Sequence, residues 1–367
     1  MVVRSSAGNL FYDKQNAYGY SCTRVKARKA LMLDKQFFED LLNQRTLDGI
    51  TSMLERTYYK RSITELSTIQ SGTELLEMAA EVHYKDAVNQ VRRFAPEDGK
   101  PVINMLMRKW DIINLRTIIS SRRTGKTWEQ MRPYLVSAGE LYVHEMERIA
   151  KAEPEKLYMR IKETSVGRQI LSNSSRNMRG TELEQLFIKA VKSFQVLNQL
   201  QAILDTSYYD YLQRGIVSSD KDVIWIKKTV AKEIDLRNIM SVLRLKKNGV
   251  KDPARIATYI IRGGRINSAF VEALLKANSS KEVLSTIKPL FKIKGEDFTS
   301  LPVLEASLQQ ELANERVRVF YKNPVSIATL AGFLFIKEEE MNNIRKIVRG
   351  KDYNLSPEEI RPMLVFY

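Results

Sequence analysis

The sequence holds little of the material from which disulfides, metal sites and membrane spans are made. Cys22 is the one cysteine among 367 residues, so no disulfide can form within the chain. The two histidines, His83 and His144, supply too few ligands for a zinc site. The longest mainly apolar run, residues 325–336, is shorter than the roughly 20 residues that a membrane-spanning helix needs. We therefore expect a soluble chain in a reducing compartment, with no metal and no cofactor.

Glycine and proline are also scarce, with 16 and 10 residues, and the segments between them carry apolar residues at intervals of three and four. That spacing places apolar side chains on one face of a helix, whereas strands need alternation. The stretch LEQLFIKAVKSFQVLNQLQAIL, residues 183–204, is an example, and Thr181 with Glu184 forms a capping-box pattern at its start. The sequence predicts an all-α fold.

Basic residues exceed acidic ones, with 59 Lys and Arg against 43 Asp and Glu, which gives a formal charge of +16. Such an excess favours acidic partners, namely nucleic acid, anionic lipid surfaces or acidic protein faces. The basic residues are spread along the chain, and no established nucleic-acid-binding motif is present, which argues against nucleic acid. A basic helical nucleic-acid-binding protein and a helical scaffold stay open as alternative functions.

An acid and an asparagine recur in three segments of the chain. The segments read DIINLRTIISSRRTG, DLRNIMSVLRLKKNG and EMNNIRKIVRGK, and a short helical segment follows each of them. In each, the asparagine stands three residues after the acid; the pairs are Asp111 with Asn114, Asp235 with Asn238 and Glu340 with Asn343. This recurrence predicts three diverged helical units, over residues 1–150, 151–277 and 278–367.

The acid and the asparagine continue the apolar stripe of their helix, because residues three and four apart share a helix face. We expect them to be buried, and a buried carboxylate or amide needs hydrogen-bond partners. The interpretation that we favour is structural: the motif caps an adjacent helix end or ties a neighbouring loop to the helix. A cation site formed by the three acids is disfavoured, because no further oxygen-rich cluster accompanies them. A role at a partner interface is the third alternative.

Basic residues close each of the three segments. They are either solvated charges near helix C-termini, where cations interact favourably with the helix dipole, or a basic surface that faces an acidic partner. The candidates for partner contact are Arg122, Arg123, Lys246, Lys247, Arg349 and Lys351.

Motifs that would indicate nucleotide binding or catalysis are incomplete. The tripeptide GKT at residues 125–127 has Ser120 where a phosphate-binding loop needs a glycine. It is better explained as a helix end followed by a glycine that adopts the left-handed conformation. His144 lacks the second histidine of a zinc protease motif, and no other residues form a catalytic set. We expect no enzymatic activity.

Three parts of the sequence together resemble one protein family. The N-terminal NAYGYSCTRVKARKALMLDKQFFEDLL is an aromatic-rich segment that leads into an Arg-Val-x-Ala pattern and a Leu-rich stretch. The triple acid-x-x-Asn motif is similar to an internal repeat of the family, and KEEEMNNIRKIVRGKDYNLSPEEIRPML is similar to its closing segment. Over essentially its whole length the chain resembles the C subunit of archaeal-type (A-type/V-type) and related bacterial rotary ATPases, which is the counterpart of the d subunit of the vacuolar ATPase.

The resemblance implies an all-α, funnel-shaped protein of three pseudo-threefold-related units. It implies a peripheral protein on the cytoplasmic face of the cell membrane, present in one copy per complex. Its partners would be the membrane proteolipid ring and the central shaft subunits, of the D and F type, and the positive charge also favours an anionic membrane surface. The implied function is that of a non-catalytic rotor adapter, which transmits torque during ion-driven ATP synthesis or ATP-driven ion pumping.

Overall fold

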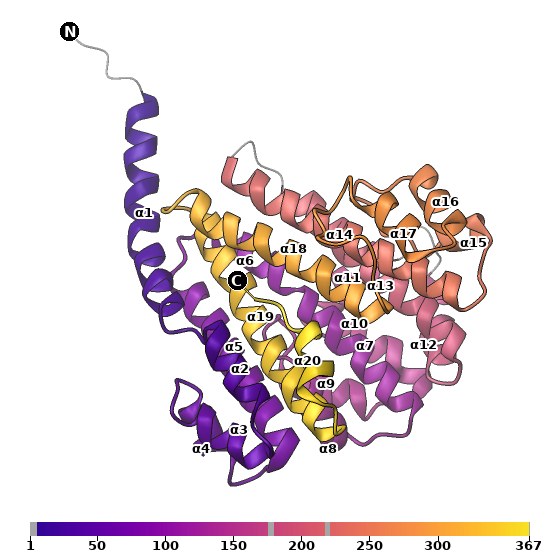
Figure 1. Ribbon diagram of the computed structural model, residues 1–367, viewed down its shortest axis with the longest axis horizontal. Coiled ribbons are helices and arrows are strands. Elements are labelled where there is room, and N and C mark those ends of the chain that lie inside the picture. The colour runs from indigo at the N-terminus through magenta and orange to yellow at the C-terminus, as the bar shows by residue number, and fades with distance from the viewer. Residues whose placement is uncertain (1–5, 175–179, 217–220, 367) are drawn as a thin grey trace. The chain divides into compact units, whose positions relative to one another are not determined.

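The computed structural model describes residues 6–174, 180–216 and 221–366, so residues 1–5 of the first predicted unit lie outside the described residues. Within the described ranges every regular element is a helix, which confirms the predicted all-α class (Figure 1). The helices up to residue 150 are α1 (Ser6–Lys29), α2 (Lys35–Leu42), α3 (Leu47–Leu54), α4 (Lys60–Leu66), α5 (Gly72–Phe94), α6 (Lys100–Met107), α7 (Lys109–Arg123), α8 (Trp128–Met131) and α9 (Val143–Ala150).

The later α-helices are α10 (Leu157–Lys162), α11 (Gly167–Ser174), α12 (Gly180–Ala190), α13 (Phe194–Gly215), α14 (Lys221–Lys247), α15 (Pro253–Ala257), α16 (Ser268–Lys276), α17 (Ser280–Ile287), α18 (Leu301–Lys322), α19 (Ile327–Asp352) and α20 (Pro357–Ile360). Short 3-10 helices lie at Arg132–Tyr134, Pro154–Lys156 and Arg361–Met363. The stretch 183–204, predicted as one helix, is interrupted between α12 and α13. Both helices carry apolar residues at helical spacing, so the periodicity alone does not reveal the turn.

Two compact units divide the chain. The first compact unit contains Met1–Asn104, Ser218–Thr229 and Leu312–Tyr367, and the second contains Met105–Val217 and Val230–Glu311. Each unit draws on segments that are distant in sequence, whereas the ranges 1–150, 151–277 and 278–367 are consecutive. The division into three repeated units therefore stays a prediction about ancestry and pseudo-symmetry.

The core of the first compact unit is built around α19. This helix contacts α1, α2, α3 and α5, and lies side by side with α5 (Figure 1). Its first turns, residues 327–336, contain most of the apolar run, and nearly all residues of the helix are buried. A helix that is apolar on every side must be surrounded by other elements, which explains its central place.

We expect Gly332→Ala to destabilise the first compact unit. A Cβ atom at Gly332 would lie 2.6 Å from Cα and 2.7 Å from N of Phe320 on α18, distances that force the two helices apart. Overpacking of this kind costs about 1–3 kcal/mol. Chemical denaturation of the two proteins measures the difference. Gly19→Ala is the matched control, because its Cβ would meet no atom within 4 Å; a Gly332 variant as stable as that control would contradict the close contact.

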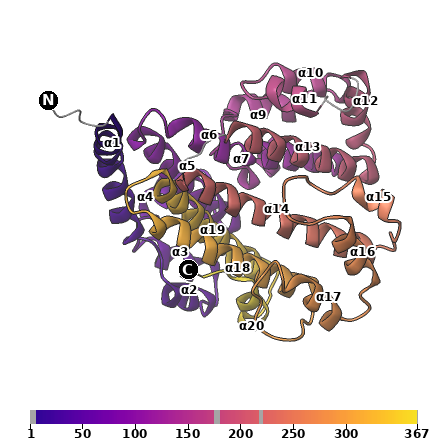
Figure 2. The same ribbon diagram turned by 90° about the horizontal axis from the view of Figure 1, so that it is seen from above.

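The second compact unit holds the first two copies of the motif. Its helix α7 contacts α9 and α13, and Figure 2 shows α7 and α13 side by side. Ile118 and Ile119 of α7 are fully buried, as is Leu204 of α13. These contacts leave the start of α7, where Asp111 and Asn114 lie, facing the loop between α8 and α9.

Candidate functional site

The three asparagines make the same contact with the backbone. Each side-chain amide donates from Nδ2 to the carbonyl oxygen of one residue and accepts at Oδ1 from the N–H of that residue, 22 or 23 positions later in the chain. The pairs are Asn114 with Val136, Asn238 with Ile261 and Asn343 with Val365, at distances between 2.6 and 3.0 Å. The amide thus satisfies both backbone groups of a buried segment that follows α8, α15 or α20.

Asp111 ties the loop before α9 to the start of α7. Its side chain is fully buried and accepts the N–H of Glu140 at 3.0 Å and the N–H of Leu141 at 2.9 Å. The preceding residue, Gly139, leaves room for the carboxylate, since a Cβ there would lie 2.0 Å from Oδ1 of Asp111. Burial raises the pKa of Asp111 to about 7, although the two N–H groups and the charge of Arg108 oppose the shift.

Asp235 makes the corresponding tie to the loop before α16. Its carboxylate accepts the N–H groups of Arg265 at 2.6 Å and Ile266 at 3.2 Å, and Nε of Arg265 lies 3.1 Å from Oδ2. A glycine again precedes the donors, because a Cβ at Gly264 would lie 2.2 Å from Oδ1 of Asp235. Each of the two loops therefore donates backbone N–H groups to a buried aspartate, and each has a glycine that leaves room for the carboxylate.

Glu340 makes its tie to a segment that is 307 residues away in sequence. It accepts the N–H of Leu33, just before α2, at 3.0 Å, and the hydroxyl of Tyr59 at 2.6 Å. Lys337, one turn earlier on α19, forms an ion pair with the same carboxylate. Glu340 thus accepts a backbone N–H just before α2, as Asp111 does just before α9. Residues from the first part of the chain therefore complete the contacts of the third motif.

The motif acids and asparagines all bond to loops of their own units, and their polar atoms are occupied by these loops. Asp111 and Asp235 belong to the second compact unit and Glu340 to the first. Within the described ranges no group of three or more His, Cys, Asp or Glu residues is arranged to hold a metal ion. The observed geometry is that of a structural tie between a helix and a loop.

Sequence reasoning missed several partners of the motif. Gly139 and Gly264 have a sequence signal, since a glycine stands at nearly the same distance after both aspartates. Leu33 and Tyr59 have no such signal, because nothing in the local pattern links them to Glu340. The GKT at residues 125–127 is the end of a helix: α7 ends at Arg123, Gly125 has a φ of +73°, and Thr127 caps α8.

We expect Asn343→Asp to destabilise the protein by about 2–3 kcal/mol. The aspartate can still accept the N–H of Val365, but it has no donor for the carbonyl oxygen of Val365, which stays buried and unsatisfied. Thermal or urea unfolding measures the loss. Asn342→Asp on the same helix is the control, because Asn342 is only partly buried. Equal stabilities of the two variants would show that the amide donor is dispensable.

Three of the six predicted basic contact residues form hydrogen bonds or an ion pair within the protein. Arg122 donates to the carbonyl oxygen of Ile149 at 3.2 Å, at the C-terminal end of α9. Lys246 donates to the carbonyl oxygens of Leu274 and Ala277, at the C-terminal end of α16. The two cations therefore satisfy carbonyl groups that a helix end leaves without partners. Arg349 forms an ion pair with the fully buried Glu77 of α5.

The other three predicted basic residues form no hydrogen bond or ion pair with the described residues. The guanidinium of Arg123 lies 5.3 Å from the ring centre of Phe194, whose side chain is well exposed. Lys247 is exposed and Lys351 is partly buried, and neither forms a hydrogen bond or ion pair with the described residues. Four of the six basic residues belong to the second compact unit and two to the first, so a ring of basic residues stays a prediction.

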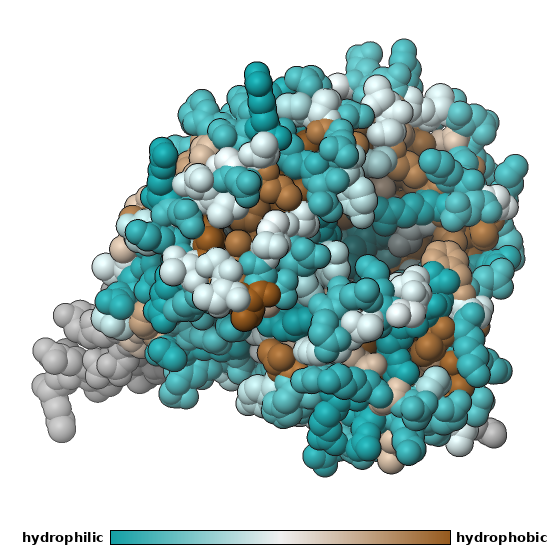
Figure 3. Space-filling view, turned by 90° about the horizontal axis from the view of Figure 1, so that it is seen from below, coloured by the Kyte–Doolittle hydropathy of each residue, from teal (hydrophilic) through white to brown (hydrophobic). Residues whose placement is uncertain are grey.

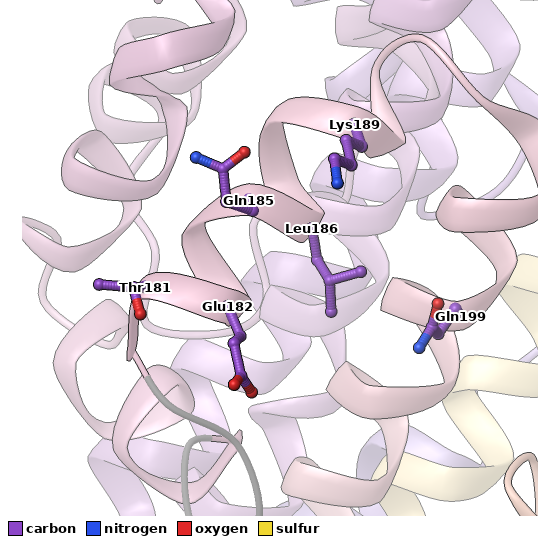
Figure 4. Close-up of a pocket in the computed structure, with 6 residues that line it drawn as sticks. All are labelled: Thr181, Glu182, Gln185, Leu186, Lys189 and Gln199. Carbon is purple, nitrogen blue, oxygen red and sulfur yellow. The ribbon is translucent and has the colours of Figure 1, made fainter.

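A depression of the second compact unit lies between α12 and α13. Its volume is about 420 Å³, and Figure 4 shows its lining: Thr181, Glu182, Gln185, Leu186, Lys189 and Gln199. One acid and one lysine are the charged groups of this lining, and it contains no histidine or cysteine. It offers no nucleophile activated by a neighbouring base.

Large apolar patches are absent from the face shown in Figure 3. In the face shown in Figure 3, hydrophilic residues cover most of the area and hydrophobic residues form small separate patches. No described helix combines the length and the apolar character that crossing a bilayer requires.

Comparison with known proteins gives the family of the chain. Its sequence matches the ATP synthase (C/AC39) subunit family over residues 21–363. It is 27% identical to the C subunit of the A-type ATP synthase of Methanosarcina mazei over 353 residues, which cover 95% of this chain and 92% of the relative. The C subunit of the A-type ATP synthase of Thermococcus onnurineus is 26% identical over 365 residues, with coverages of 96% and 91%. These matches confirm the resemblance found in the sequence, and the chain belongs to the ATP synthase (C/AC39) subunit family.

Proposed function

We propose that this protein is a non-catalytic rotor subunit of an A/V-type ATP synthase, which couples the central shaft to the membrane proteolipid ring and transmits torque between them. The observation that carries the proposal is the family match over residues 21–363. The relatives are named as C subunits of A-type ATP synthases, which supports a role as one component of the rotary complex. Torque would pass during ion-driven synthesis of ATP or ATP-driven ion pumping.

The motif geometry fits a part that must deform little under load. In each of the three segments a buried acid and a buried asparagine fix a loop to a helix by several hydrogen bonds. Close packing adds to this stiffness, as at Gly332, where two helices approach without an intervening side chain. Such a body transmits force between distant surfaces without a catalytic site.

The basic residues that form no hydrogen bond or ion pair within the protein are our candidates for partner contact. Arg123, Lys247 and Lys351 lie at helix ends and form no ion pair with a carboxylate of the described residues, although the charge of Glu358 acts on Lys351. Arg122, Lys246 and Arg349 are weaker candidates, because their charged groups already bond inside the protein. The expected partners are acidic faces of the shaft subunits, of the D and F type, or of the ring, and an anionic membrane surface beside it.

The proposal places one copy of the protein per complex, on the cytoplasmic face of the cell membrane. Its test is co-purification of the tagged full chain with detergent-solubilised proteolipid ring and recombinant shaft subunits, at about physiological salt, where the Debye length is about 8 Å. The assay is run with and without nuclease. Capture of both ring and shaft, independent of nuclease, is the expected result.

Charge reversal separates the adapter role from the contact residues. The double variant Lys247→Glu with Lys351→Glu is expected to weaken capture, whereas Lys294→Glu, an exposed lysine outside the motif segments, leaves it unchanged. Capture that survives the double variant would keep the adapter role and discard these contact residues. Absence of capture, with nuclease-sensitive binding of nucleic acid instead, would overturn the proposed function.

A further inference from the structure

A cavity of about 180 Å³ lies within the first compact unit, beside the third motif. Helices α1, α4, α5 and α19 contribute to its wall. The polar groups of its lining are mainly basic or uncharged: Arg28, Tyr58, Arg61, His83, Gln90 and Lys337. Apolar side chains, among them Leu31, Met32 and Phe333, form the rest. Since a water molecule occupies about 30 Å³ of liquid, the cavity has room for a phosphate-sized ion.

Lys337 gives this cavity a buried cation with unused donors. The residue is 5% exposed, and its ammonium forms an ion pair with Glu340 and lies 5.1 Å from the ring centre of Tyr59. An ammonium has three N–H donors, and Glu340 is its one hydrogen-bond acceptor among the described residues. A buried charge needs full hydrogen bonding, so the remaining donors favour an acceptor inside the cavity.

Two arginines add positive charge to the same cavity. Arg28 of α1 is partly buried and contacts the ring of Phe94 at 5.8 Å, but no hydrogen-bond acceptor for its guanidinium is found in the described part of the chain. Arg61 of α4 is exposed at the rim and pairs with Glu65. Asp86 is the one acid of the lining and is exposed. Glu340 balances the charge of Lys337, so the guanidinium of Arg28 leaves the buried part of the cavity with an excess of positive charge.

The pKa shifts are consistent with a positive potential in the cavity. Burial lowers the pKa of His83 to about 2, and the charges of Lys337 and Arg28 contribute to this shift. Burial also lowers the pKa of Lys337, an effect that Arg28 reinforces and Glu340 opposes. His83 is thus a neutral imidazole at physiological pH, with one donor nitrogen and one acceptor nitrogen.

An unpaired acceptor distinguishes one oxyanion from another. Oε1 of Gln90 is buried and has no hydrogen-bond partner among the described residues. Hydrogen phosphate and phosphate monoesters in their monoanionic form carry a P–OH group that can donate to such an acceptor, whereas sulfate has no proton to donate. The combination of basic donors with a buried acceptor therefore favours a phosphate group over sulfate.

We propose that the cavity between α1, α4, α5 and α19 binds a phosphate group, held by Arg28 and Lys337 and recognised through Gln90. The inference does not depend on the rotor function, because it concerns a cavity inside one compact unit. The phosphate group is that of a small soluble compound or of a phospholipid headgroup. The apolar residues of the lining are compatible with a short carbon chain attached to the phosphate.

The test uses the histidine NMR signals of the full chain, labelled with ¹³C in its histidines. His83 lies in the cavity, and His144 is stacked on Tyr142 outside it. Because the chain has two histidines, the variant His144→Gln assigns both signals. Inorganic phosphate is titrated at constant ionic strength, kept with sodium chloride. We expect a saturable shift of the His83 signal, an unchanged His144 signal, and several-fold weaker binding of sulfate.

Arg28→Gln is the variant that tests the site, since this arginine is not part of the buried tie at Glu340. Loss of one charge-assisted contact is expected to weaken phosphate binding by about tenfold. Arg45→Gln, which removes an exposed arginine elsewhere in the same compact unit, is the matched control and leaves binding unchanged. A His83 signal that does not respond, or a response equal in both variants, would overturn the proposal.

A second titration identifies the source of the phosphate group. Dihexanoyl phosphatidic acid, used below its micelle-forming concentration, is compared with inorganic phosphate and with dihexanoyl phosphatidylcholine. Tighter binding of phosphatidic acid, with the same loss in Arg28→Gln, supports the site and assigns it to an anionic headgroup. Binding of inorganic phosphate alone supports the site and assigns it to a soluble compound.

Discussion

Asp235→Ala is expected to lower the free energy of unfolding by about 3–5 kcal/mol. The substitution removes the acceptor of two backbone N–H groups, those of Arg265 and Ile266, and also the partner of the Arg265 guanidinium. A buried donor without a partner costs about 1–3 kcal/mol, and the lost carboxylate leaves a cavity beside Gly264. Urea denaturation followed by circular dichroism measures the loss.

Two further variants show whether the hydrogen bonds of Asp235 cause the loss of stability. Glu296→Ala removes an exposed carboxylate that has no hydrogen bond, and its stability should match that of the wild type. Gly264→Ala keeps the carboxylate but places a Cβ 2.2 Å from Oδ1 of Asp235, so it should also destabilise the protein. If Asp235→Ala loses less than about 1 kcal/mol, water has replaced the carboxylate and the tie contributes little.

The stability of the protein should depend on pH through Asp111. Its pKa rises from the ordinary value of 3.8 to about 7 on folding, because burial penalises the charged form. An acid with a raised pKa in the folded state binds its proton more tightly there, so its contribution to stability is fully present below 3.8 and is lost as the pH rises to about 7. A shift of roughly three units corresponds to up to about 4 kcal/mol.

The measurement is the difference in unfolding free energy between the wild type and Asp111→Asn, taken across this pH range. The difference cancels the titration of all other groups. We expect the wild type to lose stability relative to the variant as the pH rises from about 4 to about 7. A difference that is flat, or that rises with pH, would show that the N–H groups of Glu140 and Leu141 outweigh the effect of burial.

For the acid and asparagine motif, the sequence predicts the burial of the residues and part of their contacts. The recurrence of an acid and an asparagine on an apolar stripe indicates burial and a need for hydrogen bonds, and the structure shows both for all six residues. The donors that follow Asp111 and Asp235 stand about thirty positions later in both copies. The positions of these donors, and of Gly139 and Gly264, are therefore predictable from the sequence.

For the basic residues the sequence leaves more undecided, and their role in partner contact stays a prediction. Arg122 and Lys246 were predicted to be candidates for partner contact, but in the structure they bond the last carbonyl groups of α9 and α16. The sequence gives the sign and the spacing of these charges. It does not give the position of a neighbouring helix end, which decides whether a cation is free to meet a partner.

The sequence by itself determined the helical class, the family and the buried positions of the motif, because these depend on local periodicity and on recurring residue types. Only the tertiary structure decided that Leu33 and Tyr59 complete the contacts of Glu340, and that Arg28, His83 and Lys337 meet around one cavity. Those residues belong to segments far apart in the chain. Their meeting depends on how α1, α5 and α19 pack, which no local pattern encodes.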